Sequence, residues 1–199
     1  QAPLTALEAV CAATLPIDEG LAKERALFME LMAGEERAAL VHAFFAERAT
    51  VDIPEKAAHP RQIDRIAVIG GGTMGVGIAT SLLIGGYHVD LIEAQSERVA
   101  QARAGVESNL AGALKRGKID QAKFDTLTGE ALTVSTDYAS LSDVDLVVEA
   151  VFEDMDVKKQ VFGKLDAVCN PGCVLASNTS YLDVDEIAAS TSRPADVIG

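Results

Sequence analysis

Positive charge is scarce in this sequence. Its 199 residues hold 17 lysines and arginines against 30 aspartates and glutamates, so the net charge at neutral pH is −13. Nucleic acid and anionic membranes repel a chain this acidic, so we expect neither as a general partner. The deficit does not exclude a local basic site for an anionic ligand.

Cysteine is also scarce, and recognisable targeting segments are missing. The three cysteines, Cys11, Cys169 and Cys173, lack zinc-like spacing, so we expect reduced, buried thiols and no metal site. With no signal sequence visible, we expect a cytoplasmic protein. The uncharged run 66–87 is long enough to cross a membrane. However, seven glycines fall between residues 70 and 86 and the apolar period changes within the run, so we predict no membrane span.

That glycine-rich run, continued to residue 93, is the most informative stretch. An apolar run with strand composition, 66–69, precedes Gly70, Gly72 and Gly75, which fit the pattern G-x-G-x-x-G, and a helical pattern and a second strand follow. The first glycine permits the tight turn, the second lets the backbone approach a pyrophosphate, and the third packs the helix on the strand. The free N–H groups of that helix would face the phosphates.

The second strand ends on an acid. Glu93 follows Gly70 by 23 positions, near the spacing of the residue that binds the adenine ribose in dinucleotide-binding folds. A P-loop would need Gly-Lys-Ser/Thr at the end of the glycine loop, where this chain has Met74-Gly75-Val76. The stretch therefore predicts a dinucleotide site.

The rest of the chain divides into three parts. Residues 1–49 are alanine-rich and show three helical patterns, whose apolar stripes must pack on a neighbouring or missing domain. Residues 50–62 have a linker composition. In residues 63–199 strands alternate with helices, which predicts a Rossmann-type, doubly wound α/β fold with a mainly parallel sheet. Ligands bind at the carboxyl ends of such strands, here near 70–75, 149–158 and 177–180. Both chain ends have the appearance of cuts in a longer protein.

At these positions the sequence resembles the 3-hydroxyacyl-CoA dehydrogenase family, in the form found in bacterial multifunctional fatty-acid oxidation enzymes. The matching blocks are I-G-G-G-T-M-G-V-G-I-A at 69–79, V-V-E-A-V-F-E-D at 147–154, K-K-Q-V-F-G-K-L-D at 158–166, A-S-N-T-S at 176–180 and R-P-A-D-V-I-G at 193–199. The blocks at 18–28 and 42–48 resemble the tail of a crotonase-type hydratase and its linking helix.

The resemblance implies an NAD-binding domain that serves the oxidation of 3-hydroxyacyl-CoA in fatty-acid β-oxidation. Through the whole polypeptide it also implies a thiolase subunit or further copies as partners. By matched positions Ser180 would contact substrate and cofactor and is the one candidate catalytic residue. The matched positions for the adenosine side are Met74 and Glu93, those for the nicotinamide side are Val151, Phe152, Glu153 and Lys158, and those for CoA are Asn109 and Arg116.

Each of these residues has a second interpretation. Ser180 would also suit the cap of the following helix. Lys158 would pair with Asp154 on an exposed helix face, and Glu149 and Glu153 would be solvated acids at a strand end. Arg116 would be part of an ordinary basic helix end.

The family's general base is a histidine paired with a glutamate, and the match places that histidine two residues beyond Gly199. His42, His59 and His88 do not match it, so we expect this chain to hold the cofactor without the base. Two other functions stay open, a Rossmann dehydrogenase for free hydroxy acids and a non-catalytic module that senses NAD.

Overall fold

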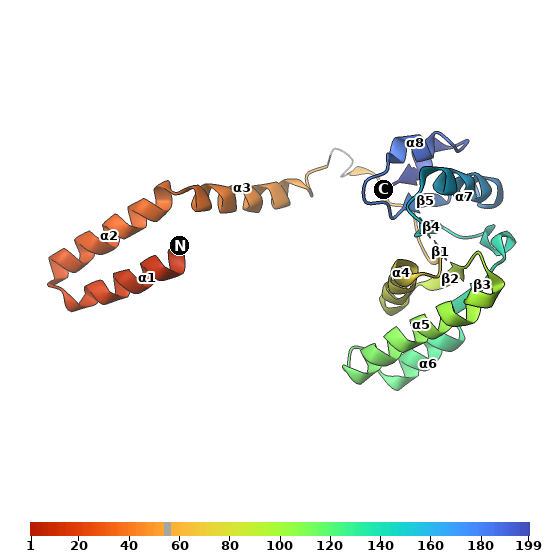
Figure 1. The fold of residues 1–199 in the computed structure, drawn as a ribbon, viewed down its shortest axis with the longest axis horizontal. Coiled ribbons are helices and arrows are strands. Elements are labelled where there is room, and N and C mark those ends of the chain that lie inside the picture. The colour runs from red at the N-terminus through yellow and green to blue at the C-terminus, as the bar shows by residue number, and fades with distance from the viewer. Residues whose placement is uncertain (54–56) are drawn as a thin grey trace. The chain divides into compact units, whose positions relative to one another are not determined.

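The computed structural model describes residues 1–53 and 57–199. Its contacts divide the chain into two compact units, residues 1–60 and 61–199, here called the helical unit and the sheet unit (Figure 1). The middle of the predicted linker, 54–56, lies outside the described residues. Arg61 ties the start of the sheet unit to its body, because its guanidinium donates to the Gly172 carbonyl and the Asp196 carboxylate.

The helical unit contains α1 (Ala2–Cys11), the 3₁₀ turn η1 (Ala12–Thr14), α2 (Ile17–Ala33) and α3 (Glu35–Ala49). Pro16 is the N-cap of α2, and Gly34 separates α2 from α3. Of the described residues in this unit only Ala12 is buried, so the apolar stripes stay exposed. Cys11 is exposed as well, and its predicted burial is wrong, whereas Cys169 and Cys173 are buried in the sheet unit.

The sheet unit is built on six parallel strands, as predicted. In chain order they are β1 (Arg65–Ile69), β2 (His88–Ile92), β3 (Leu132–Ser135), β4 (Leu146–Glu149), β5 (Val174–Ser177) and β6 (Val197–Ile198). Their order across the sheet is β3-β2-β1-β4-β5-β6. The chain therefore builds outward from β1 in one direction and then in the other, and the point of reversal lies between β1 and β4. In doubly wound sheets that point is where ligands bind.

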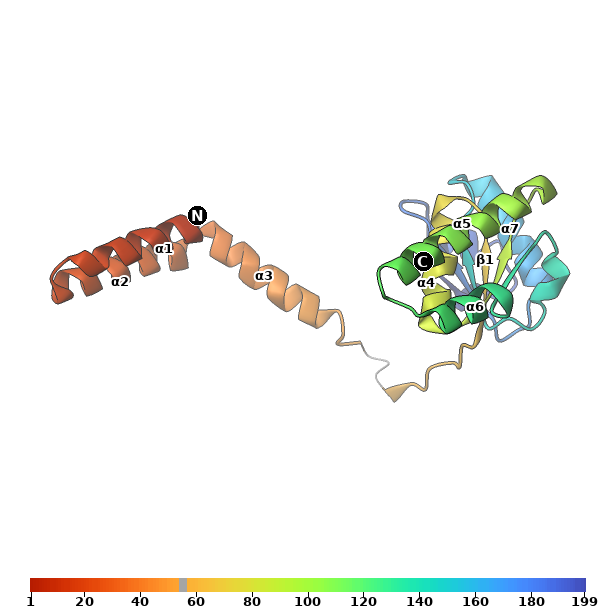
Figure 2. The same cartoon turned by 90° about the horizontal axis from the view of Figure 1, so that it is seen from below.

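Helices cover both faces of the sheet (Figure 1). One face carries α4 (Thr73–Gly85), α5 (Ser96–Lys115) and α6 (Gln121–Gly129), which lie in front of β1 in Figure 2. The other carries α7 (Met155–Val168) and α8 (Val184–Ala188), with the short turns η3 (Tyr138–Leu141) and η4 (Pro194–Asp196) completing the unit. β1 serves both cores: Val68 packs with the first set of helices and Ala67 and Ile69 with the second. This two-sided burial explains why residues 66–69 of the strand form an unbroken apolar run.

Helix α7 begins at Met155, directly after the residue that caps it. Asp154 is its N-cap, and the Asp154 carboxylate accepts a hydrogen bond from the Val157 N–H at 3.0 Å. An aspartate cap of this kind satisfies one of the free donors at the helix start. Over residues 1–53 and 57–199, neither unit has a helix with the length and hydrophobicity needed to span a bilayer.

Removal of the Phe162 ring should destabilise the sheet unit strongly. Phe162 on α7 is fully buried among strand residues, and phenylalanine-to-alanine changes in such cores cost about 3–5 kcal/mol. The chain has no tryptophan and three tyrosines, Tyr87, Tyr138 and Tyr181, all in the sheet unit. Tyrosine fluorescence during urea unfolding therefore reports on this unit alone.

The matched control is Phe28→Ala on α2, where the ring is 56% exposed. This change should leave the tyrosine transition in place. Equal shifts for the two variants would contradict the assignment of the core.

Candidate functional site

The glycine loop, residues 70–72, joins β1 to α4. Glycine is required for steric reasons at Gly70 in this loop and at Gly75 in the first turn of α4. Gly70 has φ +108°, and a Cβ there would lie 2.6 Å from the carbonyl oxygen of Ala150. A Cβ on Gly75 would lie 1.8 Å from the carbonyl oxygen of Gly70. These two glycines therefore let the first turn of α4 lie directly against the end of β1.

Gly72 differs from its neighbours because nothing within 4 Å would meet a Cβ there. It is the N-cap of α4 and provides no side-chain capping bond. The protein's own packing therefore does not require glycine at this position. Space for a ligand's phosphates beside a helix N-terminus accounts for it, and this fits a dinucleotide.

Glu93, directly after β2, is 6% exposed. One carboxylate oxygen accepts from the Gly71 N–H at 2.9 Å and the other from the Ala94 N–H at 2.8 Å. The acid thus holds the glycine loop in place while it lies at the edge where an adenine ribose would be bound. Met74, in the first turn of α4, is 58% exposed.

A buried ion pair lies on the other side of β1. Glu149 ends β4, Lys158 lies in α7, and both side chains are 0% exposed. The Lys158 ammonium donates to both Glu149 oxygens, at 2.8 and 2.9 Å. Glu149 also accepts from the Ser177 hydroxyl at 2.7 Å and from the Val151 N–H at 2.7 Å. The alternative of a Lys158–Asp154 surface pair is therefore wrong, and Glu149 is not a solvated acid.

Glu153 connects this pair to the loop after β5. Its carboxylate lies 3.2 Å from the Lys158 ammonium, and it accepts from the Thr179 hydroxyl and, at 3.1 Å, from the Ser180 N–H. The Thr179 hydroxyl, followed by the Ser180 N–H and Lys158, lowers the pKa of Glu153 below its ordinary value. Ser180 is not a helix cap, because Asp183 caps α8.

The other residues matched to the nicotinamide side lie in the same loop as Glu153. Val151 packs partly against the core, whereas Phe152 is 79% exposed. The segments that follow β1, β2, β4 and β5 thus meet at one edge of the sheet, here called the carboxyl-edge site.

Sequence reasoning gave no role to Thr179 or Ser177, although both lie in the S-N-T-S block. Their spacing carried no signal for a partner on β4 or on the loop after it.

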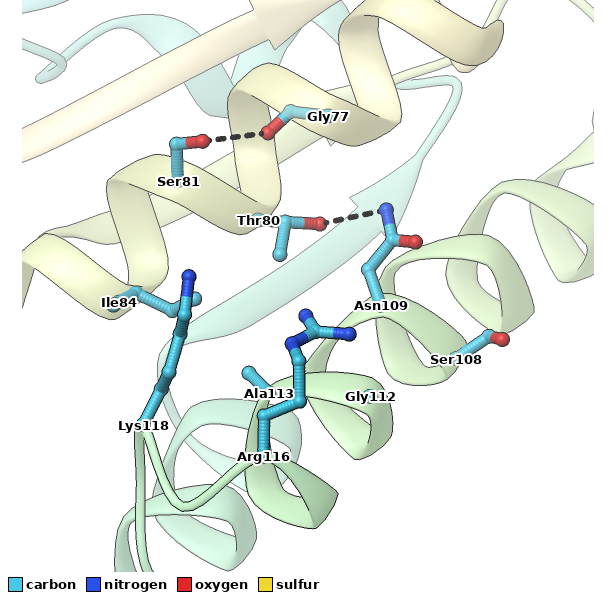
Figure 3. A pocket seen from close by; sticks show the side chains of 10 residues that line it. All are labelled: Gly77, Thr80, Ser81, Ile84, Ser108, Asn109, Gly112, Ala113, Arg116 and Lys118. Atoms are coloured by element: carbon cyan, nitrogen blue, oxygen red, sulfur yellow. Dashed lines mark hydrogen bonds between the residues drawn. The ribbon is translucent and has the colours of Figure 1, made fainter.

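A pocket lies between α4 and α5 and has a volume of about 340 Å³. Figure 3 shows the Arg116 and Lys118 side chains along this α4–α5 pocket, with Asn109 beside them. The Asn109 amide donates to the Thr80 hydroxyl at 3.3 Å. The basic residues at the end of α5 therefore face a hollow lined on the α4 side by three small residues and Ile84, which leaves room for an anionic group. Among the described residues no cluster of His, Cys, Asp or Glu could hold a metal ion.

The contacts of the Glu153 carboxylate with Thr179, Ser180 and Lys158 should weaken in acid. A carboxylate with a lowered folded-state pKa stabilises the fold above its unfolded pKa, ordinarily 4.5, and that stabilisation is lost as the pH falls through the folded-state pKa. Glu153→Gln should therefore destabilise the sheet unit by about 1.5–3 kcal/mol at pH 7, the range for hydrogen bonds to a charged group. Urea unfolding of both proteins between pH 7 and pH 3 should show the difference shrinking below pH 4.5. A constant difference would contradict this role.

Comparison with known proteins shows which family has this architecture. The family model described as the NAD-binding domain of 3-hydroxyacyl-CoA dehydrogenase matches residues 65–199. The chain is 40% identical over 186 residues to the peroxisomal fatty acid beta-oxidation multifunctional protein AIM1 of Arabidopsis thaliana, covering 90% of the chain and 25% of that protein. It is 41% identical over 204 residues to the peroxisomal bifunctional enzyme of Danio rerio, covering 100% and 28%. The chain thus spans about a quarter of the length of these relatives, which are plant and animal rather than bacterial.

Solved structures give the same result. FadB2 of M. tuberculosis has a TM-score of 0.66 at 38% identity, covering 69% of this chain and 48% of that one. The 3-hydroxybutyryl-CoA dehydrogenase of Escherichia coli K12 has a TM-score of 0.64 at 35% identity, covering 69% and 29%. The chain belongs to the 3-hydroxyacyl-CoA dehydrogenase family and carries its NAD-binding domain.

Proposed function

We propose that NAD lies across the β1–β4 boundary, with its pyrophosphate at Gly72, its adenosine half over β2 and its nicotinamide half over the ends of β4 and β5. The open space at Gly72 is the observation that carries this placement, because no contact within the protein explains it. The strand order supports it, since the sheet reverses direction at that boundary.

On the adenosine side, Glu93 would accept hydrogen bonds from the ribose hydroxyls, and the exposed Met74 would contact the adenosine. A carboxylate at this position favours NAD over NADP, whose ribose carries a 2′-phosphate. Because Glu93 also binds the Gly71 N–H, the same acid would fix the ribose and the loop that faces the pyrophosphate.

On the nicotinamide side, the loop 151–153 and Ser180 are the contact residues in this proposal. Bound NAD supplies a hydride acceptor. Ser180 is suited to hydrogen-bonding the reacting oxygen of a substrate, and Lys158, being fully buried, would act through Glu153 rather than by direct contact.

A general base is needed as well, and the histidine of the sheet unit does not supply it at this edge. His88 begins β2, at the amino end of the strands. His42 and His59 belong to the helical unit and do not match the family's base. In this proposal the base comes from a part of the polypeptide other than these three histidines.

For the whole polypeptide we propose oxidation of 3-hydroxyacyl-CoA to 3-oxoacyl-CoA in fatty-acid β-oxidation. The relatives named as β-oxidation multifunctional proteins support this, and so does the α4–α5 pocket. In a chain of net charge −13, Arg116 and Lys118 form a local cationic pair suited to a phosphate of CoA, with Asn109 as a polar neighbour.

Gly72→Val should abolish NAD binding and leave the fold intact, because the side chain would enter space that the protein does not use but the pyrophosphate needs. Gly129→Val is the matched control, since its Cβ also meets open space, at the end of α6. Calorimetric titration with NAD, and circular dichroism for the fold, test both variants. Wild-type affinity in folded Gly72→Val would refute the placement.

The CoA assignment has its own test. The double variant Arg116→Ala, Lys118→Ala should weaken binding of a 3-hydroxyacyl-CoA by ~1–2 kcal/mol, since each exposed charge contact contributes up to about 1 kcal/mol. Its NAD affinity should be unchanged. Lys164→Ala removes a cation from α7 away from this pocket and should alter neither affinity. An unchanged CoA affinity in the double variant would place the substrate elsewhere.

A further inference from the structure

The Glu149–Lys158 pair is unusual because both charges are fully removed from water. A buried ion pair stabilises a fold weakly compared with apolar side chains of the same size, because desolvation offsets the attraction. Here Glu149 accepts four hydrogen bonds from three residues: two from the Lys158 ammonium, one from the Ser177 hydroxyl and one from the Val151 N–H. The carboxylate therefore joins the ends of β4 and β5, the loop after β4, and α7.

Lys158 has three N–H donors, and Glu149 takes two of them. The remaining contact goes to Glu153, which is 27% exposed and lies at the surface of the site. Glu153 in turn holds the Thr179 hydroxyl and the Ser180 N–H. A continuous series of charge-assisted contacts therefore runs from the buried end of β4 to the loop that carries Ser180.

The charges explain why Glu149 is needed for this arrangement. With Glu149 ionised, the buried pair is neutral overall, and the Glu153 carboxylate is free to bind the loop after β5. Without that negative charge, Lys158 would be a buried cation whose one nearby anion is Glu153. The Glu153 carboxylate would then be drawn toward Lys158 and away from Thr179 and Ser180.

We infer that Glu149 is a positioning residue for the nicotinamide half of the cofactor, which acts by holding Lys158 and, through it, the Glu153–Thr179–Ser180 contacts. This inference rests on the proposed placement of NAD. It differs from a merely structural role, because it requires a loss confined to the side of the site over β4 and β5. The glycine loop and Glu93 belong to other contacts and would be unaffected.

The test compares NAD with ADP, which has the adenosine and both phosphates but lacks the nicotinamide riboside. Calorimetry on the 199-residue chain gives both affinities for wild type and Glu149→Gln. The variant should lose NAD affinity by at least ~10-fold, the factor for one charge-assisted hydrogen bond, while ADP affinity stays within about twofold. Gly72→Val should abolish the binding of both NAD and ADP, which would show that ADP binds at the glycine loop.

Two further variants complete the design. The double variant Glu149→Gln/Lys158→Met removes both buried charges and keeps the side-chain volumes similar. It serves if Glu149→Gln alone fails to fold, because it leaves no unpaired buried cation. It should show the same selective loss of NAD affinity, because Glu153 keeps Thr179 and Ser180 but loses the Lys158 ammonium that fixes the position of its carboxylate. Glu186→Gln breaks the exposed pair of α7 with α8, between Lys159 and Glu186, and should leave both affinities unchanged.

The outcomes separate the two proposals. Wild type that fails to bind NAD would refute the proposed function and this inference with it. Wild type that binds NAD, with a folded double variant of equal NAD affinity, would overturn the inference alone. An equal loss of NAD and ADP affinity in the folded variants would also overturn it, because the pair would then support the fold at large.

Discussion

The close approach of α4 to β1 is the constraint on which the site depends. A single methyl group at Gly75 would reach the Gly70 carbonyl oxygen, and Gly70 itself is pressed against the Ala150 carbonyl. Because these positions have no side chains, the first turn of α4, the end of β1 and the loop after β4 come together at the β1–β4 boundary. At Gly72, by contrast, no atom lies within 4 Å of where a Cβ would be.

The local elements of the sheet unit could be predicted because each has a strong pattern of its own. The apolar run of β1, the three glycines and the acid after β2 lie near one another in sequence. The parallel arrangement followed from their alternation with helices. The carboxyl-edge site was predicted at the level of strand ends, because parallel strands bring those ends to one edge.

The contacts within the site were less predictable, because they join residues that sequence spacing does not relate. Lys158 has Asp154 one helical turn before it, which favours a surface pair, but Asp154 is used as a cap and α7 turns Lys158 toward β4. Ser180 precedes a helix, but Asp183 provides the cap. From sequence alone, no partner was evident for the basic end of α5. In the structure it lies opposite residues of α4 across a pocket. In each case burial and tertiary packing decided between two plausible local roles.

The order of the strands also determines when each strand gains its neighbours while the chain is being synthesised. The central strand β1 receives its first neighbour soon, because Ile66 pairs with Val89 in β2, but its other neighbour is far along the chain, at Leu146 in β4. A ribosome that adds about 5–20 residues per second needs roughly 4–16 s to make the intervening 80 residues. During that interval one edge of β1, in which residues 66–69 are all apolar, has no strand partner. The nascent chain is therefore exposed to aggregation through this edge until β4 arrives.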